Sequence, residues 1–118
     1  MKKILAVDDS ASMRQMVSFT LKKAGFDVTD AKDGSEALGI AKQGTFDAVI
    51  SDVNMPVMNG IETTEWIVEH YPHVHVMALS VEDADGTILK MLKAGAVGYL
   101  LKDTKKEVLE RALLEMMD

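Results

Sequence analysis

Short apolar runs alternate along the chain with amphipathic segments, and this pattern repeats five times. The apolar runs, which predict strands, are residues 4–7, 26–31, 46–51, 74–79 and 96–101. The intervening segments carry apolar residues at helical spacing and are residues 12–24, 33–42, 61–70, 84–94 and 104–117. Continuous runs such as "ILAV" are typical of strands buried on both faces, whereas "FDVTDA" alternates and indicates a strand nearer an edge. Strict strand–helix alternation predicts a parallel sheet with right-handed crossovers and helices on both faces.

Residues with known preferences for element ends bound several of these segments. Gly25 and Gly95 stand where a left-handed residue ends a helix, and Asp33 with Glu36 forms a capping-box pattern. The dipeptide Asn59–Gly60 predicts a turn with positive φ. In the last two predicted helices the apolar stripes that we expect to face the core are Ile88, Met91 and Leu92, then Val108, Leu109, Ala112, Leu113 and Met116.

Length and composition limit the domain count and the classes of partner. The 118 residues correspond to one domain, 1–118. A net charge of −6 argues against nucleic-acid binding by this domain and leaves a basic protein partner open. The chain has no cysteine, which excludes a disulfide framework and a thiolate site. With no signal-peptide core and no membrane-spanning apolar run, these features predict a cytoplasmic protein that does not bind membranes.

Polar residues follow four of the five predicted strands at their carboxyl ends. Asp8 and Asp9 follow the first strand, Asp52 the third, Ser80 the fourth and Lys102 the fifth. In sheets of this kind the ligand site lies at that edge. Carboxylates that converge there repel one another and require a cation, and oxygen ligands favour Mg²⁺ or Mn²⁺ over zinc.

A lysine and a hydroxyl at the same edge suit a phosphoryl group. Lys102 would offset part of the acidic charge and bind an anion, to which Ser80 would donate. Asp52 is central and precedes a turn, so we expect it to be the nucleophile that forms an aspartyl phosphate. Each residue also has a structural interpretation, since Asp9, Ser10 or Ser80 would suit a helix N-cap and Lys102 a solvated loop. Their combination at one edge favours the functional interpretation.

The motifs around these residues resemble those of the receiver domains of bacterial two-component response regulators, over essentially the whole chain. They are "VDDS" at 7–10, "DGSEAL" at 33–38, "SDVNMPVMNG" at 51–60, "ALS" at 78–80 and "KAGAVGYLLK" at 93–102. The resemblance implies an α/β, flavodoxin-like (βα)5 fold, a doubly wound parallel five-stranded sheet in the order 2-1-3-4-5. It also implies a phosphoacceptor rather than an enzyme, with only self-catalysed phosphoryl transfer and autodephosphorylation.

The resemblance implies a role for each site residue. Asp52 accepts a phosphoryl group from a phosphohistidine of a sensor histidine kinase, and Lys102 and Ser80 contact the bound group. The ligands implied for Mg²⁺, with Mn²⁺ as an alternative, are Asp8, Asp9, Asp52 and the backbone carbonyl of Asn54.

Family members also switch a protein-interaction surface. On phosphorylation Ser80 moves toward the phosphate and Tyr99 turns inward, although an aromatic at this place would also suit a simple strand edge. The face formed by the segments 84–94, 96–101 and 104–117 then changes its downstream protein partner. The resemblance implies a monomer or a phosphorylation-dependent dimer.

Positions near the site that vary within the family help to set the lifetime of the phosphoryl group. Asn54 and Glu82 resemble the pair found in fast-cycling chemotaxis regulators. Val81 stands where many members have alanine, and its branched side chain would narrow the path of water or donor. We therefore predict slower turnover than in a Val81→Ala variant. Most receivers follow the lysine with a cis proline, so Asp103 leaves the geometry of the Lys102–Asp103 bond open.

The resemblance is mixed along the chain. The first part is similar to chemotaxis receivers, whereas "TTEWIVEHYP" and "KAGAVGYLLKDT", after about Ile61, are similar to receivers of helix-turn-helix transcription regulators. A chimera of two receivers, a receiver excised from a DNA-binding regulator and ordinary family diversity are the open explanations. We expect no attached effector domain, since the sequence stops just after the last helix. A phosphohydrolase with an aspartate nucleophile is another alternative, but that class usually has a second acid two residues after the nucleophile, where this chain has Asn54. A pseudo-receiver, which never carries phosphate, is a further alternative, and the complete acidic set argues against it.

Overall fold

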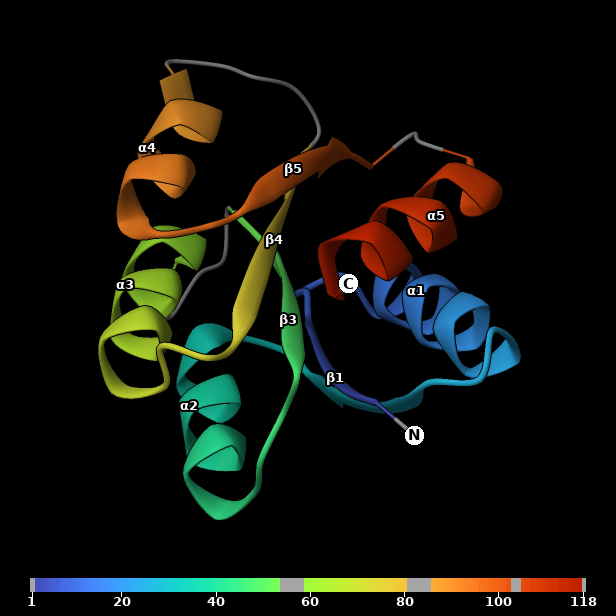
Figure 1. Ribbon diagram of the computed structural model, residues 1–118, viewed down its shortest axis with the longest axis horizontal. Helices are drawn as coiled ribbons and strands as arrows, with labels where there is room; N and C mark the ends of the chain where they lie inside the picture. The colour runs from blue at the N-terminus through green and yellow to red at the C-terminus, as the bar shows by residue number, and fades with distance from the viewer. Residues whose placement is uncertain (1, 54–58, 81–85, 103–104, 118) are drawn as a thin grey trace.

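Five parallel strands form a single sheet at the centre of the molecule (Figure 1). The computed structural model describes residues 2–53, 59–80, 86–102 and 105–117. The strands are β1 (Lys3–Val7), β2 (Asp27–Ala31), β3 (Ala48–Asp52), β4 (His75–Ser80) and β5 (Gly98–Leu101). Their order in the sheet is β2-β1-β3-β4-β5. The flavodoxin-like fold class and the strand order implied by the family resemblance are both confirmed.

Helices cover both faces of this sheet. They are α1 (Ala11–Lys23), α2 (Gly34–Gln43), α3 (Gly60–His70), α4 (Thr87–Ala94) and α5 (Lys106–Met117). Figure 1 shows α1 and α5 together on one face, and α2, α3 and α4 on the other. Within the described ranges, no helix combines the length and the apolar character that crossing a bilayer requires.

The strands contribute alternate side chains to two cores. Ile4 and Ala6 of β1 pack with residues of α1 and α5, whereas Leu5 and Val7 pack on the side of α2, α3 and α4. Because both faces of β1 are buried from Ile4 to Val7, an apolar residue is required at each of these positions, which explains the unbroken run "ILAV". The edge strand β2 instead alternates buried and exposed positions at its start, as its sequence predicted.

Side-chain caps fix the starts of the first helices. The Oγ of Ser10 accepts a hydrogen bond from the Met13 amide at 3.3 Å, so Ser10 has the structural role that we considered for it. Asp33 accepts from the Glu36 amide at 2.8 Å, as the capping-box pattern predicted. Because Ser10 caps α1 and only Asp8 and Asp9 separate it from the end of β1, the cap holds these two acidic residues at the sheet edge.

The predicted positive-φ turn at Asn59–Gly60 is wrong. Asn59 has φ −71° and caps α3, its Oδ1 accepting from the Glu62 amide at 2.9 Å. Gly60 is not among the glycines with positive φ. Its lack of a side chain matters for packing instead, because a Cβ there would overlap the Asp52 carbonyl oxygen and lie 2.9 Å from the Cα of Val53.

Two further predictions for the C-terminal half are wrong. The helix predicted from residue 84 begins at Thr87, because Gly86 has φ +68° and its left-handed backbone cannot continue a helix. Residue 84 itself lies outside the described residues. Leu92 and Val108, which we expected to face the core, are 39% and 44% exposed. Their neighbours Met91 and Leu109 take the core positions, about 100° away around each helix.

Candidate functional site

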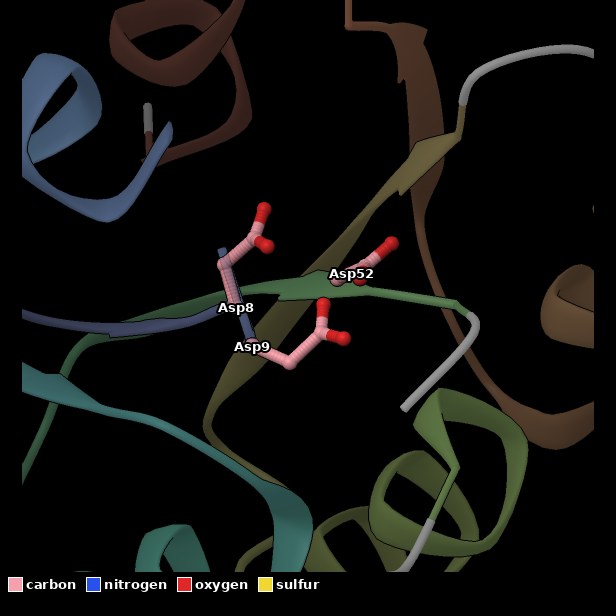
Figure 2. A group of neighbouring side chains, drawn as sticks. All are labelled: Asp8, Asp9 and Asp52. Atoms are coloured by element: carbon pink, nitrogen blue, oxygen red, sulfur yellow. The ribbon is translucent and has the colours of Figure 1, made fainter. Parts of the chain in front are cut away.

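The pairing of β1 with β3 places two carboxylates side by side at the carboxyl edge of the sheet. Val7 pairs with Ser51, so Asp8 and Asp52 are the next residues along two neighbouring strands. The Asp8 amide still donates to the Ala31 carbonyl at 3.1 Å, which continues the ladder toward β2. Figure 2 shows Asp8 and Asp9 at the end of β1 and Asp52 at the end of β3.

The three carboxyl groups converge. Oxygen atoms of Asp8, Asp9 and Asp52 all lie within 4.8 Å of one another. Asp8 and Asp52 are buried, at 2% and 4% exposure, whereas Asp9 is exposed. The cluster therefore has two desolvated members and one that opens to solvent.

Lys102, directly after β5, bridges the two buried acids. Its Nζ lies 3.1 Å from Asp8 Oδ2 and 3.1 Å from Asp52 Oδ1. Its own amide donates to the Ser80 carbonyl at 2.7 Å, which fixes the backbone at the end of β4 and β5. Burial alone would lower the pKa of Lys102, but its hydrogen bond to Asp8 and the charge of Asp52 outweigh burial and raise that pKa. The ammonium is therefore a fixed positive charge in the site.

The carboxyl group of Asp52 is hard to ionise. Burial raises its pKa, and the neighbouring charge of Asp8 raises it further, while Lys102 acts in the opposite direction. The net result is a pKa of about 6, against an ordinary value of 3.8. One lysine shared between two acids does not neutralise both of them, so the site retains excess negative charge.

One oxygen of Asp8 is left with unused hydrogen-bonding capacity. Its Oδ1 accepts from the Ser10 amide at 2.9 Å and from Lys102 at 3.4 Å. Its Oδ2 is buried and lies at ion-pair distance from Lys102, yet the geometry there makes no hydrogen bond. A buried carboxylate oxygen with a free lone pair, beside two more carboxylates, fits a hard divalent cation. The cluster could therefore hold a metal ion.

The other predicted site residues are placed as follows. Ser80 is buried at the end of β4, one residue beyond Leu79, which pairs with Asp52. Tyr99 lies on β5 and is 48% exposed. The predictions for Asn54, Val81, Glu82 and the Lys102–Asp103 bond concern positions outside the described residues.

Two residues near the site were missed from the sequence. Gly60, whose packing is described above, had been interpreted only as a turn residue. Arg14 donates from Nη1 to the backbone carbonyl of Asp8 at 2.7 Å. A signal for Arg14 was available, because it lies three and seven residues before Val17 and Leu21 and so shares the buried face of α1.

Comparison with known proteins identifies the family. The family description of the response regulator receiver domain matches residues 4–114. The chain belongs to the response regulator receiver family. The resemblance noted from the sequence motifs is thereby confirmed, and receiver domains as a class work with histidine kinases and downstream targets in two-component systems.

This receiver domain has relatives in both chemotaxis and transcription. It is 35% identical over 112 residues to the transcriptional regulatory protein DegU of Brevibacillus brevis, covering 93% of this chain and 48% of that protein. It is 39% identical over 116 residues to the chemotaxis protein CheY-3 of Vibrio cholerae, covering 92% of this chain and 89% of that protein. The chain thus spans about half of the first relative and most of the second.

Solved structures of response regulators match over the same length. The chemotaxis protein CheY4 of Vibrio cholerae superposes with a TM-score of 0.93 and 42% identity, covering 98% of both chains. The receiver domain of a putative response regulator NarL from Mycobacterium tuberculosis has a TM-score of 0.89 and 27% identity, covering 98% of this chain and 95% of that chain. The matches to the transcriptional regulatory protein DegU and to the chemotaxis protein CheY-3 each cover more than nine-tenths of this chain, so neither kind of relative is restricted to one half of it.

Proposed function

We propose that this receiver domain is a phosphoacceptor in which Asp52 takes a phosphoryl group from a phosphohistidine of a sensor histidine kinase. The observation that carries the proposal is the buried Asp52 carboxylate, 3.1 Å from the Lys102 ammonium and clustered with two further acids. Carboxylates are established nucleophiles toward phosphorus, and positive charge next to the nucleophile suits an incoming phosphoryl group.

The transfer forms one bond and breaks one. A carboxylate oxygen of Asp52 attacks phosphorus, the P–N bond of the phosphohistidine breaks, and its electron pair stays on the imidazole nitrogen, which takes up a proton. Asp52 must be ionised to attack, and its pKa of about 6 makes it so at neutral pH. Lys102 then pairs with the phosphoryl oxygens, and Ser80 offers a hydroxyl to them from the end of β4. A single group is accepted per chain, so this proposal is not that of an enzyme with a separate substrate.

The acidic cluster fits Mg²⁺, with Mn²⁺ as the alternative. Asp8, Asp9 and Asp52, with the backbone carbonyl of Asn54, would hold the ion. When bound, the ion would offset the charge of the carboxylates and of the phosphoryl oxygens. The unused Asp8 Oδ2 and the excess negative charge of the cluster support this assignment.

Signalling would pass through the surface formed by α4, β5 and α5. We propose that Ser80 moves toward the phosphoryl group, that Tyr99 turns inward, and that this surface then changes its downstream protein partner. Support comes from the apolar side chains exposed there, which are Leu89, Leu92, Val97, Tyr99, Leu101, Val108 and Leu114. We expect a monomer or a dimer that forms on phosphorylation, acting in the cytoplasm without nucleic-acid contact of its own.

Intact mass after incubation with acetyl phosphate tests the proposal. The wild-type chain should gain one phosphoryl group in the presence of Mg²⁺, and should gain none in EDTA. Asp52→Asn should gain none under either condition, whereas Asp27→Asn, a matched change at an exposed acid of β2, should behave like the wild type. Labelling of Asp52→Asn would place the nucleophile elsewhere, and multiple turnover of small phosphate esters would favour a phosphohydrolase instead.

A second candidate is the receiver portion of a longer transcription regulator. The observation that favours it is the DegU match, which covers 48% of that protein. The sequence of the complete natural gene decides this point, since it either continues into a DNA-binding domain or stops. The same measurement tests the chimera, which stays a prediction until one natural gene is found to encode the whole chain.

A further inference from the structure

Arg14 connects three elements around the acidic cluster. From α1 its Nη1 donates to the backbone carbonyl of Asp8 at 2.7 Å, just beyond the end of β1. Its Nε lies 3.7 Å from Asp30 Oδ2 on β2. The side chain of Arg14 is 21% exposed and that of Asp30 is 50% exposed, whereas Asp8 is buried. The hydrogen bond from Arg14 to the Asp8 carbonyl is therefore better shielded from water than the ion pair with Asp30.

The hydrogen bond from Arg14 fixes the peptide that joins Asp8 to Asp9. The Asp8 carbonyl belongs to this peptide, and a donor held on it sets the orientation of the peptide plane. That orientation decides where the backbone of Asp9 continues and where its carboxylate emerges. Arg14 therefore acts on both acids from the backbone side, without contact with either carboxylate.

The remaining groups of Asp8 are held as well. Its amide donates to Ala31 at 3.1 Å, and its Oδ1 accepts from the Ser10 amide at 2.9 Å. With the carbonyl held by Arg14, the residue is fixed at three points, and Oδ2 is left facing Lys102. An oxygen anchored in this way is preorganised for a ligand that needs defined geometry.

We propose that Arg14 is a positioning residue for the acidic cluster. It holds the Asp8–Asp9 peptide in the orientation in which both carboxylates converge with Asp52 on a divalent cation. The inference rests on the proposed function, because it assumes that the cluster binds such a cation. Asp30 supports the arrangement by keeping the guanidinium turned toward the end of β1.

Positioning and simple charge predict opposite results for one substitution. Arg14→Met removes the positive charge and the carbonyl hydrogen bond but keeps an unbranched side chain that favours a helix. If Arg14 acted only through its charge, its removal would strengthen cation binding. If it positions the acids, cation binding weakens by roughly tenfold or more, as for other residues that orient metal ligands.

Arg14→Lys separates the two effects further. The charge is kept, but one ammonium cannot reproduce the planar fork that serves the Asp8 carbonyl and the Asp30 carboxylate together. Positioning therefore predicts weaker binding than in the wild type, and charge alone predicts no change. Asp30→Asn should weaken binding by about twofold relative to Asp27→Asn, which removes the same charge from the same strand without touching Arg14.

The experiment is a titration of the full chain with Mn²⁺, followed by electron paramagnetic resonance of the free ion, at one pH and ionic strength. The metal-free proteins are compared by the carbonyl carbon shift of Asp8 and the amide nitrogen shift of Asp9, which should move in Arg14→Met and stay in Asp27→Asn. Thermal melts establish that each variant is folded. If Arg14→Met does not fold, the comparison of Asp30→Asn, which retains Arg14, with Asp27→Asn tests the proposal instead.

Each outcome decides a different question. Binding that is lost in Asp52→Asn and weakened in both Arg14 variants supports the proposal. Wild-type binding with unchanged or tighter binding in Arg14→Met overturns the positioning role and leaves the proposed function intact. Absence of binding in the wild type itself overturns the metal assignment, and the inference with it.

Discussion

Gly60 lies directly against the backbone of Asp52, so closely that a β-carbon on residue 60 would overlap the Asp52 carbonyl oxygen. The Gly60 amide also donates to the Val53 carbonyl at 2.8 Å. The first turn of α3 is therefore seated on the end of the strand that presents the candidate phosphoacceptor. The position of that carboxylate depends on a contact between two backbones.

Gly60→Ala should destabilise the fold, because both neighbours are backbone and cannot move aside cheaply. We expect a loss of about 1–3 kcal/mol in the free energy of unfolding, as for other overpacked sites. Gly39→Ala, in α2 with nothing within 4 Å of a new Cβ, is the matched control. It should raise stability by about 0.5–1 kcal/mol. Urea denaturation measures both, and equal effects would contradict the packing argument.

Asp52→Asn should stabilise the metal-free protein in a pH-dependent way. The folded-state pKa of Asp52 is about 6, above its ordinary 3.8, so the folded state holds the proton more tightly than the unfolded state. Stability is therefore lost as the pH rises through that interval, by at most about 3 kcal/mol. The variant lacks this loss, so its advantage should be small near pH 4 and full above about pH 7.

The measurement is a series of urea denaturations of both proteins in EDTA between those pH values. Asp27→Asn controls for the loss of one carboxylate at an exposed site. A constant difference between Asp52→Asn and the wild type across the series would contradict the raised pKa.

Lys102→Met should leave two buried carboxylates without their shared cation. We expect a loss of about 3 kcal/mol or more in the free energy of unfolding of the metal-free protein above neutral pH. The pKa of Asp52 should rise further, since Lys102 opposes the effect of burial on it. The loss should therefore shrink on acidification, as Asp52 takes up its proton. Lys93→Met, at an exposed position of α4, should show neither effect in the same pH series.

Ser18→Ala should stabilise the protein. The Ser18 hydroxyl is buried in α1 and has no hydrogen-bond partner among the described residues. Removing an unsatisfied hydroxyl and gaining helix propensity should together contribute about 1 kcal/mol. Ser12→Ala, at an exposed position of the same helix, is the comparison, and it removes a hydroxyl that has a partner, the Oγ of Ser10 at 3.3 Å. A gain at Ser18 no larger than that at Ser12 would show that the buried hydroxyl carries no penalty.

Much of the fold could be predicted because it depends on local chemistry. Runs such as "ILAV" predict buried strands, and Asp33 with Glu36 marks a helix start, since both depend on residues adjacent in sequence. The carboxyl edge of a parallel sheet then predicts that Asp8, Asp52 and Lys102 meet. The strand order itself came from the family resemblance, because no local pattern encodes which strands become neighbours.

The rest depends on contacts between distant segments. The sequence gives no sign that Gly60 must fit against Asp52, since the same dipeptide also suits a turn. Leu92 and Val108 have the same apolar character as their buried neighbours, and only the rotation of each helix on the sheet exposes them. The raised pKa of Asp52 likewise follows from its burial by the folded chain and from the charge of Asp8. Both causes come from residues that are distant from Asp52 in the sequence.

The placement of Lys102 has a consequence for the lifetime of the assembled site. The lysine follows β5, a strand of four residues at the sheet edge whose one neighbour among the described strands is β4. It reaches an aspartate 94 positions earlier in the chain. Short edge strands open by local fluctuation at a lower free energy than the central strands. Each such opening withdraws the ammonium while the rest of the molecule stays folded. A partner that clamps β5 would therefore raise the fraction of molecules with a complete site without touching a single carboxylate.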